Sequence, residues 1–323
     1  MKTLLTGGAG YIGSHTSLAL LDEGHDVTII DDLSTGNKEL IPKKAKFINS
    51  NINNTSVVGK LLQKEKFDIL MHFAGYIKVE ESVKNPQKYY NNNAENAKIL
   101  FDTCAENNLT NIIFSSTAAA YGNPIDTKPV LETSLLKSLN PYGESKIQAE
   151  KYLQNNSKIN HIILRYFNVA GADPLMRSGI ITKNATHLIK LAAEVVIGKK
   201  NKITIFGNDY PTPDGTAIRD YIHVSDLANI HIKTLKYISK NSKSLILNCG
   251  YGKPYSVLEI ANILKKKNKK TQINFKNRRP GDVAEVYSNT KKFDKILKLK
   301  PKYNSLEYIL NSAHMWEKRL ILK

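Results

Sequence analysis

The chain has 323 residues, enough to bury a large α/β core and to carry a smaller second lobe. Its formal net charge of +18 raises the question of nucleic-acid binding, but Lys outnumbers Arg by 41 to 6, whereas base and phosphate recognition relies on Arg. We therefore interpret the charge as surface composition that attracts anionic substrates, and we predict no nucleic-acid partner.

Signals for targeting, membranes and metals are missing from the pattern. The first predicted strand begins at Lys2, which leaves no room for a leader peptide, and no apolar run approaches the roughly 18 residues that span a membrane. Cys104 and Cys249 lie in apolar segments without metal-ligand spacing. These features predict a cytoplasmic protein with no membrane partner and no metal site.

The first half of the chain alternates apolar strand-like runs with amphipathic helical segments. This pattern predicts an α/β fold with a doubly wound parallel sheet of the Rossmann type. The strand candidates are residues 2–6, 26–31, 46–51, 68–75, 111–117 and 161–169.

Beyond about Ala170 the rhythm breaks into segments rich in Pro, Gly and Asp, which we interpret as a smaller α/β C-terminal substrate lobe. We assign residues 1–170 to a nucleotide-binding domain and residues 171–323 mainly to the second lobe. Strand-like runs recur later in the chain, so we expect segments at about 208–250 to return to the first domain.

A glycine-rich turn follows the first strand, with Gly7, Gly10 and Gly13 at the head of an apolar helix. Such glycines let backbone N–H groups approach a pyrophosphate at the positive end of the helix, although a plain strand-to-helix turn would look similar. Asp31 ends the second strand 18 positions after Gly13, close to the roughly 20 expected of a carboxylate that binds the adenosine ribose. That carboxylate would repel a 2′-phosphate, so the pattern predicts NAD rather than NADP.

Tyr142 and Lys146 stand one helical turn apart after this unit. With 16 Tyr and 41 Lys, a Tyr-x-x-x-Lys spacing is expected about twice by chance, and it recurs at Tyr287 and Lys291. Only the first pair follows a dinucleotide-binding unit and a proline suited to the first turn of a helix. We predict that Tyr142 is a general base whose pKa is lowered by the Lys146 ammonium, reinforced by the positive nicotinamide of NAD. We interpret the second pair as surface.

With these features in order, the chain resembles the extended short-chain dehydrogenase/reductase family and, within it, the UDP-glucose 4-epimerases. The resemblance implies an NAD-dependent isomerase that interconverts UDP-glucose and UDP-galactose at C4 through a transient 4-keto sugar. It also implies a homodimer, formed through helices around residues 87–107 and 141–154. The motifs that carry the resemblance are TGGAGYIGSH, HFAG, YYNNN, FSST, YGESK, RYFNVAGADP, FGNDYPTPDGTAIRDYIHVSDLA and RRPGD.

The same resemblance implies the roles of individual residues. Thr117 joins Tyr142 and Lys146 in catalysis by hydrogen-bonding the sugar oxygen. The implied cofactor contacts are Gly7, Gly10, Tyr11, Ile12, Gly13, Asp31, Asn51, Ile52, Phe73, Ala74, Gly75, Asn93, Tyr142, Lys146 and Tyr166. The implied substrate contacts are Thr117, Asn168, His187, Leu188, Thr204, Phe206, Arg219, Arg279, Asp282 and Val286.

Within this set, Arg219 and Arg279 are expected on the diphosphate, Asp282 on the uridine ribose and Phe206 at the uracil. A structural ion pair with Asp220 or Asp226 is the alternative for Arg219. Val286 stands where a Tyr crowds the sugar pocket in members limited to glucose and galactose. We therefore hypothesise that UDP-GlcNAc and UDP-GalNAc are substrates as well.

Other functions stay open on the same residues. A 4,6-dehydratase is disfavoured because Ala118 and Ala119 stand where those enzymes carry an Asp-Glu pair. An epimerase for UDP-uronates, or a UDP-GlcNAc specialist, would keep the fold and change the substrate. A non-enzymatic NAD-sensing or nucleic-acid-binding protein is the third alternative, and the intact Thr117, Tyr142 and Lys146 set argues against it.

Overall fold

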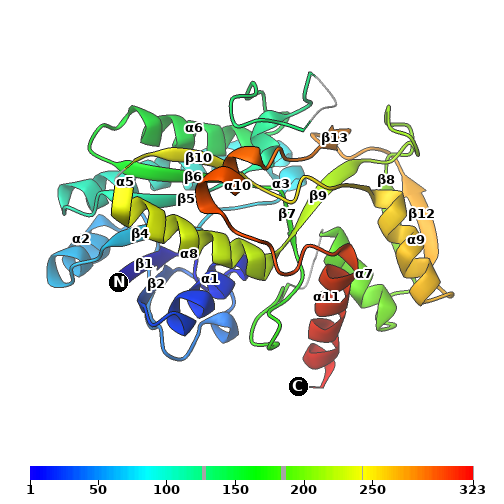
Figure 1. The fold of residues 1–323 in the computed structure, drawn as a ribbon, viewed down its shortest axis with the longest axis horizontal. Coiled ribbons are helices and arrows are strands. Elements are labelled where there is room, and N and C mark those ends of the chain that lie inside the picture. The colour runs from blue at the N-terminus through cyan, green and yellow to red at the C-terminus, as the bar shows by residue number, and fades with distance from the viewer. Residues whose placement is uncertain (126–128, 183–186, 242, 323) are drawn as a thin grey trace.

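The computed structural model describes residues 1–125, 129–182, 187–241 and 243–322. In these residues, seven parallel strands form one sheet in the order β10-β6-β5-β4-β1-β2-β3 (Figure 1). The predicted doubly wound parallel sheet is confirmed. The order reverses between β1 and β4, and in doubly wound sheets the carboxyl ends of the strands at such a point border a ligand-binding crevice. The strands are β1 (Lys2–Thr6), β2 (Asp26–Asp31), β3 (Lys46–Asn49), β4 (Ile69–His72), β5 (Asn111–Thr117), β6 (Asn160–Tyr166) and β10 (Leu245–Cys249).

Helices cover both faces of this sheet because successive strand residues point in opposite directions. Leu4 and Leu5, neighbours in β1, belong to different hydrophobic cores. One core contains residues of α1 (Tyr11–Asp22), α8 (Val224–Asn241) and α10 (Lys291–Leu297). The other contains residues of α2 (Thr55–Lys64), α5 (Asn96–Glu106) and α6 (Pro141–Asn155).

Three strands end earlier than the sequence predicts. The predicted run 46–51 ends at Asn49 as β3. Residues 73–75 leave β4 and turn at the crevice, so the strand stops at His72. The predicted run 161–169 divides at Phe167, whose N–H donates to the Cys249 carbonyl, and β7 (Asn168–Ala170) continues into another sheet. Short turns complete this part: η1 (Lys38–Leu40), α3 (Val79–Lys84), α4 (Pro86–Tyr89), the π-helical η2 (Tyr90–Glu95) and η3 (Ala118–Tyr121).

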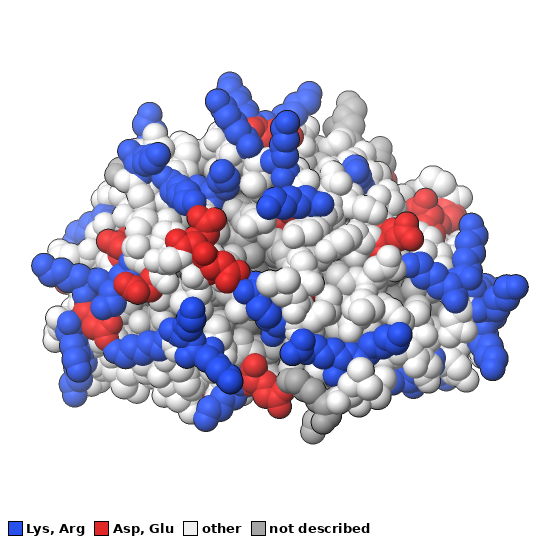
Figure 2. Space-filling view, turned by 60° about the horizontal axis from the view of Figure 1, so that its bottom comes forward, with Lys and Arg blue, Asp and Glu red and all other residues white. Residues whose placement is uncertain are grey.

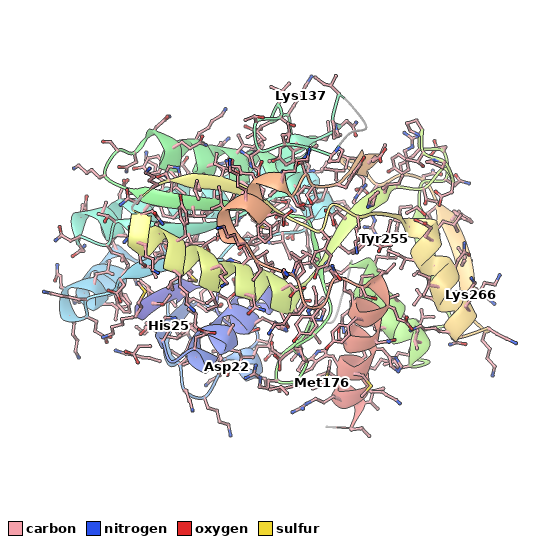
Figure 3. The ribbon with its side chains drawn as sticks, in the orientation of Figure 1. Asp22, His25, Lys137, Met176, Tyr255 and Lys266 are labelled. Carbon is pink, nitrogen blue, oxygen red and sulfur yellow. The ribbon has the colours of Figure 1, made fainter. Side chains whose placement is uncertain are left out.

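The second lobe is built around β9 (Ile218–His223), which pairs with β7, β11 (Pro254–Ser256) and β13 (Glu285–Val286). A separate two-stranded parallel sheet joins β8 (Lys202–Phe206) and β12 (Gln272–Lys276). Helices α7 (Leu188–Val196), α9 (Val257–Lys267) and α11 (Leu306–Ile321) pack on these strands. Figure 3 shows Tyr255 of β11 near this core and Lys266 toward the outer end of α9.

The chain passes more than once between two parts of the molecule: the seven-stranded sheet with its helices, here called the first layer, and the second lobe. Helix α8 and strand β10 lie in the first layer, although they follow β7, β8 and β9 in the sequence. A loop after β7 is tied back to the first layer, because Arg177 forms an ion pair with Asp22 at the end of α1. Figure 3 shows Asp22 and Met176, the residue before Arg177, at the same edge of the molecule. The domain limits inferred from the sequence stay a prediction.

Candidate active site

The glycine turn between β1 and α1 has the backbone shape that a pyrophosphate needs. Gly7 has a φ angle of +73°, and a Cβ there would lie 2.5 Å from the backbone nitrogen of Ala74. A Cβ at Gly13 would collide with the Gly7 carbonyl oxygen, so both positions require glycine. The turn continues from Gly10 into α1, whose first turn carries no acidic side chain. The N–H groups of that turn are therefore available to an anion.

Asp31 is held firmly at the end of β2. Its Oδ2 accepts from the Ala9 N–H at 3.0 Å and its Oδ1 from the Leu33 N–H at 2.8 Å. Burial raises the pKa of this carboxyl, and the two backbone hydrogen bonds act in the opposite direction. Each oxygen retains lone-pair capacity for a ribose hydroxyl. The geometry around Asp31 therefore fits the adenosine end of a dinucleotide.

The turn after β4 lies between the glycine turn and Lys146. A Cβ at Gly75 would lie 3.1 Å from Asn93 Oδ1 and 3.3 Å from Lys146 Nζ. The buried Asn93 side chain holds this turn, because its Oδ1 accepts from the Tyr76 N–H at 2.8 Å and its Nδ2 donates to the Tyr76 carbonyl at 2.9 Å. Asn93 thus shapes the crevice through its contacts with protein. Phe73 packs against the core beneath it.

The other predicted cofactor residues have partners within the protein. Asn51 Nδ2 donates to Asp32 at 2.8 Å, and the Tyr11 hydroxyl donates to the Gly171 carbonyl at 2.6 Å. Ile12 and Ile52 pack in the two cores.

The hydroxyl of Tyr166 also has a hydrogen-bond partner within the protein. Its hydroxyl lies 2.6 Å from His231 Nε2, and His231 Nδ1 lies 2.8 Å from the Leu227 carbonyl. Because a carbonyl only accepts, Nδ1 carries the imidazole proton and Nε2 accepts from Tyr166. The cofactor roles of these five residues stay predictions.

The three predicted catalytic residues meet where β5 ends. Thr117 is the last residue of β5, while Tyr142 and Lys146 lie in the first half of α6. The Thr117 side chain lies close enough to the Tyr142 phenol to act on its pKa. Lys146 is 2 % exposed, and its Nζ donates to the Ser115 carbonyl at 2.9 Å and lies 4.8 Å from the centre of the Phe114 ring. A hydroxyl, a phenol and an ammonium therefore converge beside the crevice.

Burial dominates the protonation of this group in the protein alone. Desolvation raises the pKa of the Tyr142 phenol, and the Thr117 side chain acts against that rise. Desolvation lowers the pKa of Lys146 to about 8, while the Glu150 charge acts to raise it. Desolvation therefore opposes ionisation of the phenol in the protein alone, and the lowered pKa predicted from the sequence for the complex with NAD stays a prediction.

The predicted diphosphate ligand Arg219 is an ion-pair partner of another predicted ligand. Its Nη2 donates to Asp282 Oδ1 at 2.7 Å and to the Val283 carbonyl at 2.7 Å. The alternative from the sequence was an ion pair with Asp220 or Asp226, and the structure shows Asp282 as the partner instead. Register explains this, since β13 runs parallel to β9 and brings the preceding loop beside Arg219.

Arg279 stacks on Phe206, with its guanidinium carbon 3.9 Å from the ring centre. His187 is exposed, yet nearby protein atoms desolvate its imidazole and lower its pKa, and the Arg279 charge lowers it further. Arg279 and Phe206 border a surface pocket of about 410 Å³. The pocket is lined by Glu80, Phe206, Lys276, Asn277, Arg278, Arg279 and Pro280.

Val286 links the substrate end to the catalytic end. It is buried in a small cluster with Ala118, which follows Thr117, and with Phe167, which precedes Asn168. Asn168 itself is exposed on β7. Leu188 packs on the second-lobe core, and Thr204 is half-buried on β8, two residues before Phe206.

Known proteins share this fold and sequence. A model of the NAD dependent epimerase/dehydratase family matches residues 3–250. This chain belongs to that family. It is 42% identical to a UDP-glucose 4-epimerase of Azospirillum brasilense, over 99% of this chain and 92% of the relative.

Solved structures of epimerases have a fold similar to that of this chain. The fold is similar to that of a UDP-glucose 4-epimerase from Bifidobacterium longum in complex with NAD+ and UDP, with a TM-score of 0.92 and 32% identity over 99% of this chain and 98% of that one. It is also similar to a UDP-Glc/GlcNAc 4-epimerase from Campylobacter jejuni, with a TM-score of 0.83 and 43% identity over 98% and 99% of the two chains. The family resemblance seen in the sequence is confirmed.

Several polar residues around this epimerase-family site were not predicted from the sequence. Glu80 lines the pocket beside Arg279, and a buried ion pair between Glu150 and Arg165 lies behind Thr117. Two signals pointed to that pair. Arg165 is the one Arg in a largely apolar strand, and Glu150 follows Lys146 by four residues on one helix.

Surface charge and metal-ligand clustering add little to the site of this family member. Figure 2 shows Lys and Arg side chains spread over the visible face, with Asp and Glu groups between them. Among the described residues, no group of His, Cys, Asp and Glu side chains is arranged to hold a metal ion. The helices in the described part of the chain include none that is long and apolar enough to cross a membrane.

Proposed function

We propose that this protein interconverts UDP-glucose and UDP-galactose by inverting C4 of the hexose, with NAD as its cofactor. The observation that carries the proposal is the convergence of Thr117 and Tyr142, with Lys146 one helical turn from Tyr142, beside a glycine turn shaped for a dinucleotide. Membership of an NAD-dependent family and relatives named UDP-glucose 4-epimerase support it.

The residues of the crevice fit NAD and divide its parts among them. The glycine turn and the α1 N-terminus would hold the pyrophosphate, Asp31 the adenosine ribose, and Lys146 the nicotinamide ribose. When bound, NAD supplies the acceptor that takes hydride from C4 and returns it, together with a positive charge near the phenol. The protein residues then have to move only a proton and to orient the sugar.

Tyr142 moves that proton. In its phenolate form it takes the proton of the C4 hydroxyl, and it returns the proton when the opposite face of C4 has been reduced. Lys146 stabilises the phenolate through its charge, because an ammonium close to a phenol favours the ionised form. Thr117 hydrogen-bonds both Tyr142 and the sugar oxygen, so it keeps the oxygen in line with the phenol.

The second lobe holds UDP while the hexose turns. Arg219 and Arg279 carry guanidinium groups suited to two-point contacts with a diphosphate. Asp282 would accept from the uridine ribose, and Phe206 would contact the uracil. Arg219 then exchanges part of its ion pair with Asp282 for the ligand, because both charged groups acquire new partners in the complex.

We infer that N-acetylated UDP-hexoses are substrates too. Val286 is small and buried, and it packs with Ala118 beside the catalytic threonine. A valine leaves more room at this position than a tyrosine for an N-acetyl group. The relative from Campylobacter jejuni, named a UDP-Glc/GlcNAc 4-epimerase, supports the same assignment.

We also propose a cytoplasmic homodimer. The dimer would form through the helical surfaces at residues 87–107 and 141–154, where Ile99 of α5 is 37% exposed. Cys104 and Cys249 are buried free thiols, as expected in a reducing compartment. Sedimentation of the protein at micromolar concentration tests the dimer, and Ile99→Lys should shift it toward the monomer.

The first test is turnover of UDP-galactose by the purified protein with no NAD added. We expect conversion to UDP-glucose by retained cofactor, and a loss of about 10²- to 10⁴-fold in kcat for Tyr142→Phe, because the phenyl ring cannot exchange a proton. No conversion of UDP-galactose even with NAD supplied would contradict the proposal. UDP-GlcNAc and UDP-glucuronate would then identify a related substrate.

A further inference from the structure

A buried charge pair lies directly behind the proposed catalytic residues, and the reaction described above makes no use of it. Arg165 of β6 and Glu150 of α6 are 2% and 0% exposed, and Arg165 Nη2 lies 2.6 Å from Glu150 Oε2. Arg165 Nε also donates to both carboxylate oxygens, at 3.1 and 3.2 Å. A buried ion pair often adds little net stability over well-packed apolar side chains. Its place in the fold therefore points to another role.

The pair connects the elements that carry the site. Ser116, the residue before the catalytic threonine, donates its hydroxyl to Glu150. Arg165 Nη1 donates to the Tyr121 hydroxyl at 3.0 Å, and Tyr121 in turn donates to Asn248 Oδ1 at 2.6 Å. Strands β5, β6 and β10, turn η3 and helix α6 are thereby joined through one hydrogen-bonded network. Such a network fixes how α6 sits against the end of β5.

The same pair also controls the charge next to Lys146. Glu150 follows Lys146 by four residues on α6, so their side chains share a helix face. With no other cation nearby, the carboxylate would attract the Lys146 ammonium toward itself. Arg165 occupies the carboxylate instead, and Lys146 donates to the Ser115 carbonyl at 2.9 Å. The Glu150 charge therefore acts on the Lys146 ammonium through space, without a hydrogen bond between the two side chains.

We propose that Arg165 and Glu150 are positioning residues for this reaction: the pair aligns Tyr142 with Thr117, and the Glu150 carboxylate helps to keep Lys146 protonated. This inference rests on the proposed function. It adds two residues that touch neither the substrate nor the cofactor in that scheme and act through Tyr142 and Lys146.

The surroundings of Lys146 support the electrostatic part. Glu150 acts to raise the pKa of Lys146, against burial, which lowers it to about 8. His72 on β4 is the other nearby titratable group from a neighbouring strand, and burial followed by the Lys146 charge holds its pKa well below the usual range, so it stays neutral. Tyr142 lies on the same helix face, and the Asn93 amide nearby is uncharged. Among these described neighbours, Glu150 is the one that carries a negative charge at neutral pH.

The test compares Glu150→Gln with Glu317→Gln across pH 6 to 10. Glu317 is a matched control, since its carboxylate belongs to an ion pair with Lys190 of similar burial, between α11 and α7. For Glu150→Gln we expect kcat on UDP-galactose to fall about 10-fold with KM within about 2-fold. We also expect the alkaline limb of the kcat profile to move down by about one pH unit, because Lys146 loses its proton earlier. Glu317→Gln should lower Tm and leave kcat and the profile unchanged.

A second variant separates position from charge. Arg165→Lys keeps the positive charge but loses the guanidinium group that donates to both Glu150 oxygens. We therefore expect kcat to fall several-fold, while the alkaline limb of its pH profile does not move. If both Glu150→Gln and Arg165→Lys keep wild-type kcat and pH profile, the inference is overturned. If Glu150→Gln does not fold, an Arg165→Lys enzyme with wild-type kcat overturns it alone. A wild-type protein that converts no UDP-hexose overturns the proposed function itself, which is a different result.

Discussion

The two ends of the candidate site are built in different ways. The cofactor end consists mostly of main chain: a glycine turn with no space for a Cβ, and a carboxylate, Asp31, fixed by two backbone N–H groups. The substrate end consists of side chains from distant segments that satisfy one another, such as Arg219 with Asp282 and Arg279 with Phe206.

This difference predicts different sensitivities. Main-chain geometry is set by the fold before a ligand arrives, so added atoms at the cofactor end should abolish binding. Side-chain pairs have to exchange partners when a ligand arrives, so a change of charge at the substrate end should weaken binding only by the hydrogen bonds and ion pairs that it removes. Four experiments can break or sharpen this comparison.

The largest effect is expected at Gly13. Gly13→Val places a side chain against the Gly7 carbonyl oxygen, so we expect the affinity for NAD to fall at least about 100-fold. UDP affinity, measured by calorimetry, should stay within about 3-fold, because the second lobe is unchanged. Gly59→Ala is the control, since a Cβ there meets open space on α2 and should stabilise the helix by up to about 1 kcal/mol. Normal retention of NAD by Gly13→Val would refute the steric argument.

The neighbouring arginines of the RRPG segment offer a matched pair at the substrate end. Arg279 stacks on Phe206, whereas Arg278 stacks on Tyr210 and bonds to the exposed Asp209. We expect Arg279→Met to raise KM for UDP-galactose about 10- to 30-fold with kcat within about 3-fold, as for loss of uniform binding. Arg278→Met should change KM less than about 3-fold. Equal effects of the two variants would show that the pocket, rather than Arg279, determines affinity.

Substitution of Val286 tests whether this side chain borders the hexose of the substrate. Val286→Tyr should lower kcat/KM for UDP-GlcNAc about 10-fold, because the ring fills space next to Ala118, while UDP-galactose should change less than about 3-fold. Val286→Ala, which keeps the space open, should retain both activities. A wild-type enzyme that turns over UDP-galactose well and the acetylated pair not at all would remove the hypothesis.

The smallest effect is expected for two buried histidines, one from each end of the candidate site. His231 lies under Tyr166, with its pKa lowered by burial to about 4, and His223 lies in β9, with its pKa lowered by burial to about 3. The unfolded chain therefore binds more protons below about pH 6.5, and stability falls as pH drops from 6.5 through these folded-state pKa values. At pH 5.5 each should cost about 1 kcal/mol in the free energy of unfolding. His231→Asn and His223→Asn should each reduce the pH dependence of the free energy of unfolding, measured by urea unfolding. An unchanged pH dependence in both variants would contradict this assignment.

The strands and the glycine turn could be predicted because their signals are local. Apolar runs of five to seven residues form β1, β2 and β5 within the predicted limits. The run 161–169 was predicted as one strand and divides at Phe167, because its end pairs with β9, which lies far along the chain. No local pattern carries that pairing.

The contacts among site residues were harder to foresee, for the same physical reason. The bond between Arg219 and Asp282 depends on β13 lying parallel to β9, a register that residue spacing does not encode. Asn93 and Tyr166 occupy motif positions, yet their polar atoms are satisfied by Tyr76 and His231. Motifs thus indicated which residues surround the site, and tertiary packing decided which polar atoms face one another.

Strand β10 has a consequence for how the chain is made. It completes the main sheet by pairing with β6, yet it is synthesised roughly 80 residues later, after β7, β8 and β9. While the chain leaves the ribosome, the outer edge of β6 exposes unpaired N–H and C=O groups that could pair with another chain. The seven-stranded sheet is thus finished only after much of the second lobe has emerged, so the two halves depend on each other during synthesis.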